Sequence, residues 1–200
     1  RPGPRTVAVA LAAPPAGIGP NTGLMLCLHN WGGRYDQPDY LTWCRTFAER
    51  YNVIGISVNY LQSGGGEPTV PGEMPYDHGY LQAGDCLRAL WHVRRRLTEA
   101  GIAFNPHRTY STGGSGGGNV SLMVNKFAPR SFACVVDICG MPGLTDGIAY
   151  GTGEYGSRLN AGWSRDPASP AWLSPCQQQI RDPGDPDHLR LQAEANPANK

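Results

Sequence analysis

The sequence predicts an α/β protein with a doubly wound, mostly parallel β-sheet. Short apolar runs alternate with longer amphipathic segments over residues 24–139, in the order strand, helix, strand, helix, strand, helix, strand. This alternation is typical of βαβ units, in which a helix crosses the sheet between two parallel strands. A chain of 200 residues suits one such domain, and we expect its core to comprise about residues 6–140.

Five segments are expected to be strands because they are short, rich in apolar or β-branched residues and bounded by turn residues. The run from Leu24 to His29 is apolar along nearly its whole length, as expected of a strand buried on both faces of a parallel sheet. The expected strands are residues 6–11, 24–29, 53–60, 109–112 and 132–139.

Three segments are expected to be helices that cover this sheet. Residues 40–51 have one apolar face, with Asp36 or Asp39 near the helix start. Residues 78–100 have a longer apolar stripe and end before a glycine, and residues 120–127 form a mostly buried helix that ends before Pro129.

Charge and composition exclude several classes of partner. The formal net charge is +1, which gives no reason to expect a nucleic acid or an acidic membrane as a partner. No apolar run approaches the roughly 18–20 residues that span a bilayer, so we expect no membrane partner. The sequence carries no signal for the oligomeric state. It begins with Arg1 rather than methionine, so the natural start can lie further upstream.

The six cysteines form no C-x-x-C motif and no pair with zinc-ligand spacing. Most fall within expected strands or helices, where a free cysteine behaves as a small buried hydrophobic residue. We therefore expect free thiols, a cytoplasmic location, and neither a metal nor an organic cofactor. A disulfide between Cys134 and Cys139 stays open as an alternative.

A glycine-rich motif separates the fourth expected strand from the helix that follows. Gly113-Gly114-Ser115-Gly116-Gly117 has the pattern G-x-S-x-G, and its position between a strand and a helix is that of a nucleophile elbow. A serine there has a strained backbone, and we expect the flanking glycines to be required because strand and helix pass very close together. The helix would direct its free N–H groups at the reacting centre.

A second turn, His29-Asn30-Trp31-Gly32-Gly33, follows an earlier strand. With these two motifs, residues 6–140 resemble the α/β-hydrolase superfamily, in particular esterases, dienelactone-hydrolase-like enzymes and prolyl-oligopeptidase-like peptidases. The resemblance implies an α/β-hydrolase fold and a carboxylesterase-like serine hydrolase that acts on a small-molecule ester or a peptide. Asn30 departs from the glycine that is usual at its position.

The resemblance also implies roles for individual residues. Ser115 would attack the substrate carbonyl, and the backbone N–H groups of Trp31 and Gly116 would form the oxyanion hole. His29, Asn30, Trp31 and Gly114 would lie against the substrate, and we expect His29 to brace the turn rather than to act as the base.

The acid and the histidine of the triad follow the serine in this superfamily. Asp137 is a candidate acid at the end of the next strand, although a turn carboxylate is the simpler interpretation. His188 is the only histidine after Ser115 and comes early for the base. We therefore expect a fragment whose acid and base lie beyond residue 200. The alternative is a non-catalytic binding protein that has this fold and lacks a complete triad.

Residues 141–186 are expected to form a cap or loop region over the site, and their aromatic residues suit an apolar or aromatic acyl group. Residues 187–200 would form a helix that leads into a missing strand. Residues 151–156 match G-x-G-x-x-G, but no clear strand precedes them, so dinucleotide binding is disfavoured. The elbow is not a P-loop, because Asn119 stands where that motif requires lysine.

Overall fold

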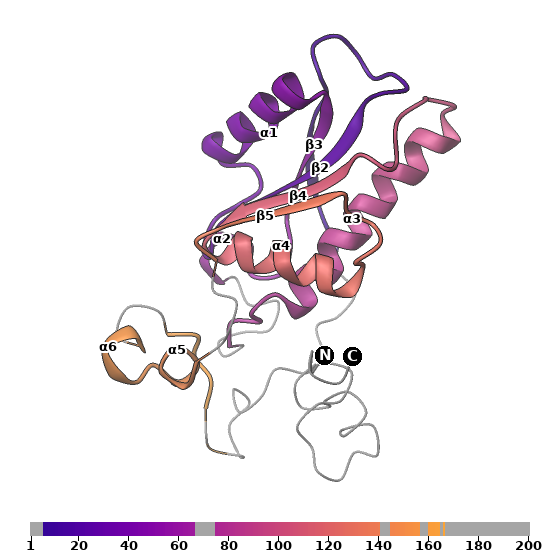
Figure 1. The fold of residues 1–200 in the computed structure, drawn as a ribbon. Coiled ribbons are helices and arrows are strands. Elements are labelled where there is room, and N and C mark those ends of the chain that lie inside the picture. The colour runs from indigo at the N-terminus through magenta and orange to yellow at the C-terminus, as the bar shows by residue number, and fades with distance from the viewer. Residues whose placement is uncertain (1–5, 67–74, 141–144, 157–159, 165, 167–200) are drawn as a thin grey trace, which may run out of the picture. The chain divides into compact units, whose positions relative to one another are not determined.

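The computed structural model of the chain describes residues 6–66, 75–140, 145–156, 160–164 and 166 (Figure 1). These residues belong to two compact units. The larger unit is the described part of residues 4–69 and 78–143, and the smaller unit is the described part of residues 70–77 and 144–200. The helix expected at residues 187–200, together with Cys176 and His188, lies outside the described residues.

The larger unit is built on a five-stranded sheet with the strand order β1-β3-β2-β4-β5. The strands are β1 (Val9–Ala12), β2 (Gly23–Leu28), β3 (Val53–Val58), β4 (Thr109–Gly114) and β5 (Cys134–Ile138). β1 is antiparallel to β3, and every other neighbouring pair is parallel. The α/β class, the mostly parallel sheet and the five expected strands are confirmed.

The register brings the ends of three parallel strands to one edge of the sheet. Leu28 of β2 pairs with Gly113 of β4, and Gly113 pairs with Asp137 of β5. The turn after β2 and the G-x-S-x-G motif after β4 therefore leave the sheet at the same carboxyl edge. Ligand sites of open α/β sheets are found at this edge.

Helices cover the two faces of this sheet unequally (Figure 1). α3 (Tyr80–Glu99) and α4 (Gly116–Phe127) pack on one face, α1 (Pro38–Tyr51) packs on the other, and α2 (Ser63–Gly66) is a single short turn. The main core is formed by residues of β2, β3, α3 and α4. It comprises Leu24, Leu26, Leu28, Ile54, Ile56, Val58, Tyr60, Ala83, Cys86, Ala89, Leu90, Val93, Leu97, Val120 and Val124.

The start of α4 differs from the sequence expectation, whereas the start of α1 agrees with it. α4 begins at Gly116 rather than near residue 120, so its first turn is made largely of glycine. Glycine is a poor helix former, and the close backbone packing described below explains its presence there. α1 begins at Pro38, with Gln37 at its N-cap and Asp39 in its first turn, so the expected carboxylate near the helix start is present.

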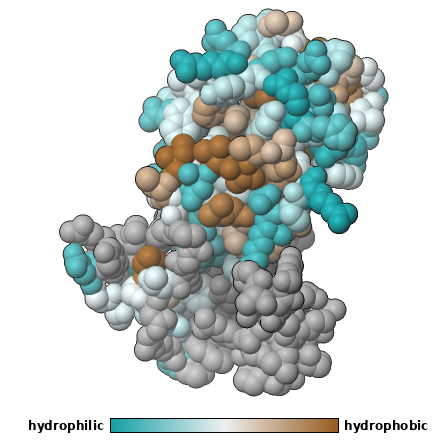
Figure 2. Space-filling view, viewed as in Figure 1, coloured by the Kyte–Doolittle hydropathy of each residue, from teal (hydrophilic) through white to brown (hydrophobic). Residues whose placement is uncertain are grey.

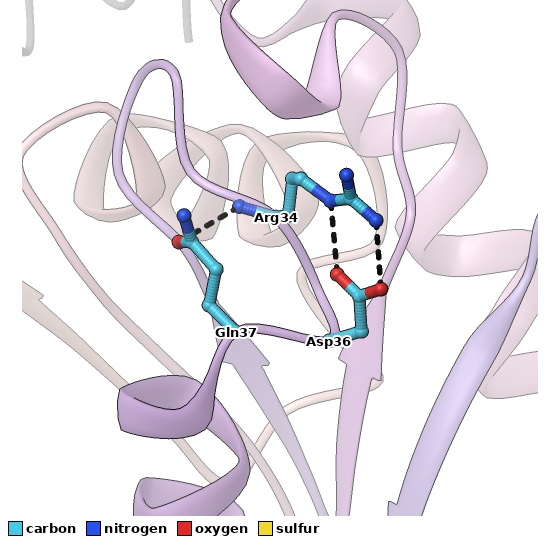
Figure 3. A network of polar contacts seen from close by, with 3 residues as sticks. All are labelled: Arg34, Asp36 and Gln37. Atoms are coloured by element: carbon cyan, nitrogen blue, oxygen red, sulfur yellow. Dashed lines mark hydrogen bonds and ion pairs between the residues drawn. The ribbon is translucent and has the colours of Figure 1, made fainter.

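Asp36 instead forms an ion pair in the segment that precedes α1 (Figure 3). The Arg34 guanidinium donates from Nε to Asp36 Oδ1 (3.0 Å) and from Nη2 to Oδ2 (2.8 Å), and it lowers the pKa of that carboxyl group. The backbone N–H of Arg34 donates to Gln37 Oε1 (3.1 Å). These bonds fix the entry into α1, although an ion pair this exposed contributes little to stability.

The face of the sheet that carries α1 leaves apolar residues exposed over β4 and β5. Figure 2 shows hydrophobic side chains gathered over these strands. Val136 and Ile138 of β5 are 44% and 47% exposed. They line a groove of about 430 Å³ together with Phe47 and Tyr51 of α1. Parallel sheets are usually covered on both faces, so the exposure of this face is unusual for the fold class.

The described cysteines are free thiols, three of them buried and two exposed. Cys134 and Cys139 are the exposed pair, so the alternative of a disulfide between them is wrong. Among the described helices, none combines the length and the apolar character needed to cross a membrane.

The smaller unit contains two short helices, α5 (Asp146–Tyr150) and α6 (Gly153–Gly156). Trp163 is buried in this unit, and its indole N–H donates to the carbonyl oxygen of Tyr76 (3.1 Å). The G-x-G-x-x-G match at residues 151–156 follows helix α5 rather than a strand. A dinucleotide-binding loop follows a strand, so residues 151–156 do not form such a loop.

A substitution at Gly55 tests how closely α1 packs on β3. An alanine Cβ at this position would lie 2.7 Å from the carbonyl oxygen of Cys44 in α1, so the helix would have to shift. We expect Gly55→Ala to lower the free energy of unfolding by about 1–3 kcal/mol, as measured by urea denaturation.

Gly84→Ala in α3 is the matched control. A Cβ there meets no atom within 4 Å, and alanine is a better helix former than glycine by about 1 kcal/mol, so this variant should be stabilised. If Gly55→Ala were as stable as the wild type, the close contact between α1 and β3 would be contradicted.

Candidate active site

Ser115 lies at the tip of the connection between β4 and α4 in a strained backbone conformation. Its φ and ψ angles are 52° and −121°, a combination that non-glycine residues rarely adopt. Its N–H donates to the carbonyl oxygen of Ile138 at the end of β5 (2.9 Å), and its own carbonyl oxygen accepts from the N–H of Asn119 (3.2 Å). The residue is exposed, so the strain holds a serine hydroxyl in the open at the carboxyl edge.

The glycines around Ser115 differ in whether the surrounding atoms leave space for a Cβ. A Cβ at Gly113 would overlap the backbone of Gly117, and a Cβ at Gly117 would overlap the carbonyl oxygens of Leu28 and His29. A Cβ at Gly114 would meet its nearest atom at 3.8 Å, which is ordinary contact. The expected close approach is therefore present at Gly113 and Gly117, whereas space alone does not require glycine at Gly114.

Gly117 also brings the turn after β2 against the start of α4. This turn, residues 29–33, is closed by a hydrogen bond from the N–H of Gly33 to the carbonyl oxygen of Asn30 (2.9 Å). Gly32 has a φ angle of 80°, as the third residue of such a turn often requires, and Trp31 occupies the second position. The two sequence motifs therefore meet through backbone contact at Gly117.

Tyr40 of α1 fixes Asn30 in this turn. The tyrosine hydroxyl accepts from the backbone N–H of Asn30 (3.1 Å) and donates to its side-chain Oδ1 (2.6 Å). Glycine at position 30 has no side chain and could not make the second bond. The asparagine that departs from the superfamily pattern is therefore held by the hydroxyl of Tyr40. The sequence alone gave no signal for Tyr40.

His29 is buried beneath the turn, where both ring nitrogens have hydrogen-bond partners. Nδ1 lies 2.9 Å from the carbonyl oxygen of Asn30, and Nε2 lies 2.8 Å from Ser63 Oγ. The ring stacks on Tyr60, with 4.0 Å between ring centroids. Burial lowers the pKa of His29 to about 4, so its ring is neutral at pH 7. These contacts describe a histidine that braces the turn.

Asp137 lies on β5 beside the first turn of α4. Its Oδ1 accepts from the N–H of Gly140 (2.7 Å), and a Cβ at Gly118 would overlap the same carboxylate oxygen. Within the part of the chain that the structure describes, no histidine is hydrogen-bonded to this carboxylate. Its observed contact is that of a carboxylate that caps the turn after β5.

The other described histidines are His78, His92 and His107. His92 and His107 are exposed, whereas His78 is buried before α3, where burial lowers its pKa to about 4. Among the described residues, no imidazole is hydrogen-bonded to the hydroxyl of Ser115. In the same residues, no three His, Cys, Asp or Glu side chains are grouped in a way that could hold a metal ion.

Two side chains of α3 support the site without contacting it, a role that the sequence did not reveal. Asp85 Oδ2 accepts from the N–H of Leu61 (3.0 Å), and Gln82 Nε2 donates to the carbonyl oxygen of Leu61 (3.1 Å). Gln82 Oε1 also accepts from the N–H of Gly79 at the start of α3 (2.9 Å). These bonds fix the segment between β3 and α2, which carries Tyr60 and leads into Ser63, the first residue of α2.

The buried histidines should make stability depend on pH. His29 and His78 have folded-state pKa values of about 4, below the ordinary value of 6.5. Between these values the unfolded chain binds more protons, so the free energy of unfolding should fall as the pH decreases from 6.5 towards 4. Urea denaturation at several pH values measures this dependence.

His29→Gln should weaken this pH dependence, whereas the exposed control His92→Gln should leave it unchanged. Should His29→Gln fail to fold, His78→Gln gives the same test. A wild-type stability that stays constant between pH 6.5 and 4 would contradict the burial of these neutral rings.

Comparison with known proteins shows similar structures at low sequence identity. No protein-family model matches the sequence, and no curated protein matches it significantly. The chain is similar to the acetyl xylan esterase from Aspergillus awamori, with a TM-score of 0.52 and 17% identity over 79% of this chain and 63% of that one. It is similar to a dienelactone hydrolase from Anabaena variabilis, with a TM-score of 0.54 and 18% identity over 71% of this chain and 61% of that one.

A third similar structure is brefeldin A esterase, a bacterial homologue of human hormone-sensitive lipase, with a TM-score of 0.51 and 19% identity. The match covers 72% of this chain and 38% of that one, so the chain spans less than two thirds of each of these three proteins. At such identities the likeness concerns the fold. The mostly parallel sheet, the strained Ser115 after β4 and these matches lead to one conclusion: the chain has the α/β-hydrolase fold.

Proposed function

We propose that this chain carries the nucleophile of a serine hydrolase that cleaves carboxylic esters through an acyl-enzyme. The observation that carries the proposal is the backbone of Ser115, held at a φ angle of 52° between β4 and α4 with an exposed side chain. Two of the similar structures are named as esterases and a third as a dienelactone hydrolase, which supports an ester as the substrate class.

In the proposed reaction, Ser115 Oγ attacks the carbonyl carbon of the ester and passes its proton to a general base. The carbonyl oxygen becomes an oxyanion, which accepts hydrogen bonds from the backbone N–H groups of Gly116 and Trp31. Gly116 is the first residue of α4, so the positive end of the helix dipole adds to this stabilisation. Asn30, Trp31 and Gly114 would line the substrate side of the centre, whereas the buried His29 would support the turn from beneath rather than contact the substrate.

The proposed base and its acid come from outside the described residues. His29 is an unsuitable base because both of its ring nitrogens already have partners beneath the turn. Asp137 is a weaker candidate for the acid because its carboxylate accepts from the turn at Gly140. The missing base also favours the second candidate function, a binding protein that keeps the elbow without turning over substrate.

The test is hydrolysis of p-nitrophenyl acetate and p-nitrophenyl butyrate by the natural protein that contains these residues. We expect ester turnover that falls by a factor of at least about 10³ in Ser115→Ala, because removal of a serine nucleophile leaves only the catalysis supplied by binding and the oxyanion hole. A peptide p-nitroanilide tests amide substrates in the same assay.

Ser131→Ala, in the loop before β5, is the matched serine control and should keep wild-type turnover. Folded wild-type protein that hydrolyses no ester would refute the enzyme and support the binding protein. Turnover that survives in Ser115→Ala would refute Ser115 as the nucleophile.

A further inference from the structure

We propose that Tyr60 is a positioning residue that sets the direction of the Trp31 N–H. The inference rests on the proposed function, in which this N–H is an oxyanion-hole donor. Tyr60 follows β3 and is 3% exposed, so its ring and its hydroxyl lie inside the fold. Nothing in its sequence position, as a single tyrosine after a strand, indicates such a role.

The direction of the Trp31 N–H is determined by the peptide bond that joins it to Asn30. A trans peptide is planar, so its N–H points opposite to its C=O. The carbonyl oxygen of Asn30 lies 2.9 Å from His29 Nδ1 and accepts from the N–H of Gly33, also at 2.9 Å. A group that holds the His29 ring in place therefore also holds the Asn30 carbonyl. Because the Trp31 N–H points away from this carbonyl, its direction is fixed as well.

Tyr60 holds His29 in two ways. Its ring stacks on the imidazole, with an angle of 14° between the ring planes, and its hydroxyl donates a hydrogen bond to the His29 carbonyl oxygen. On the other side of the turn, this carbonyl oxygen packs against Gly117 of α4, where a Cβ would overlap it. The carbonyl group is thus confined between the Tyr60 hydroxyl and the helix that begins after Ser115.

A second tyrosine fixes the opposite end of the same peptide. The N–H of Asn30 donates to the hydroxyl of Tyr40 (3.1 Å), while the carbonyl of His29 accepts from Tyr60. The peptide between His29 and Asn30 therefore cannot rotate without breaking a hydrogen bond at each end. The next peptide, which carries the Trp31 N–H, starts from this fixed plane.

Tyr60 is itself held by neighbouring groups. Ser63 Oγ lies 2.7 Å from the carbonyl oxygen of Tyr60 and 2.8 Å from His29 Nε2, so its one proton can be donated to either of these two acceptors. The next residue, Leu61, is bound at its N–H and at its carbonyl by Asp85 and Gln82 of α3. The hydrogen bonds therefore run from α3 through the 60–63 segment to His29 and the turn.

Tyr60→Phe keeps the ring stacked on His29 and removes only the hydroxyl. An oxyanion donor that points in the wrong direction stabilises the transition state less and leaves substrate binding unchanged. We expect kcat for p-nitrophenyl acetate to fall about 10- to 100-fold, with KM within about twofold of wild type and a similar melting temperature. Ser63→Ala, which removes the partner of His29 Nε2, should lower kcat in the same direction.

The matched control is Tyr110→Phe. Tyr110 lies on β4, away from the turn, and its hydroxyl accepts from Arg108 Nε (3.4 Å), so kcat should not change. A variant Tyr60→Phe with wild-type kcat would overturn the inference while leaving the proposed hydrolase intact. A fall in stability with KM and kcat both disturbed would indicate a merely structural role and would also overturn it.

If Tyr60→Phe does not fold, Ser63→Ala decides: a lower kcat at unchanged KM supports the inference, and an unchanged kcat overturns it. Failure of the proposed function looks different, because the wild-type protein and Ser115→Ala would then show the same ester turnover. In that case this inference fails with it.

Discussion

The candidate site depends on one backbone contact, the approach of Gly117 to the carbonyl oxygens of Leu28 and His29. Any side chain at position 117 would separate the end of β2 from the start of α4. This contact places the turn after β2 beside the helix that follows Ser115. The order β2-β4-β5 and its register bring both segments to the same edge, and the absent Cβ lets them touch.

Around this contact the fold adds buried polar groups to the apolar packing of Leu28 and Val120. His29, Tyr60 and Gln82 are each nearly inaccessible to solvent, and each is hydrogen-bonded to a backbone group. Buried polar groups are costly unless their partners are in place, so such a network favours a single arrangement of the turn. A rigid turn is what an oxyanion hole requires, because its donors must be oriented before charge develops.

The strands and the strand–turn–helix arrangement around Ser115 could be predicted because their signals are local. An apolar run such as Leu24–Leu28 and a serine flanked by glycines between a strand and a helix can be recognised without knowledge of the rest of the fold. Tyr40, Tyr60 and Ser63 could not be found in this way, since they contact the turn from positions 10 to 34 residues away. The helical glycines after Ser115 were also missed, because helix propensity argues against them and tertiary packing overrides it.

The most direct test of the nucleophile is to treat the folded protein with a fluorophosphonate and to map the adduct by peptide mass spectrometry. The structure and the proposed chemistry predict one modified residue, Ser115, and no modification once the protein has been unfolded in urea. An adduct on another serine, or none on folded protein, would contradict the claim that this strained and exposed serine is activated.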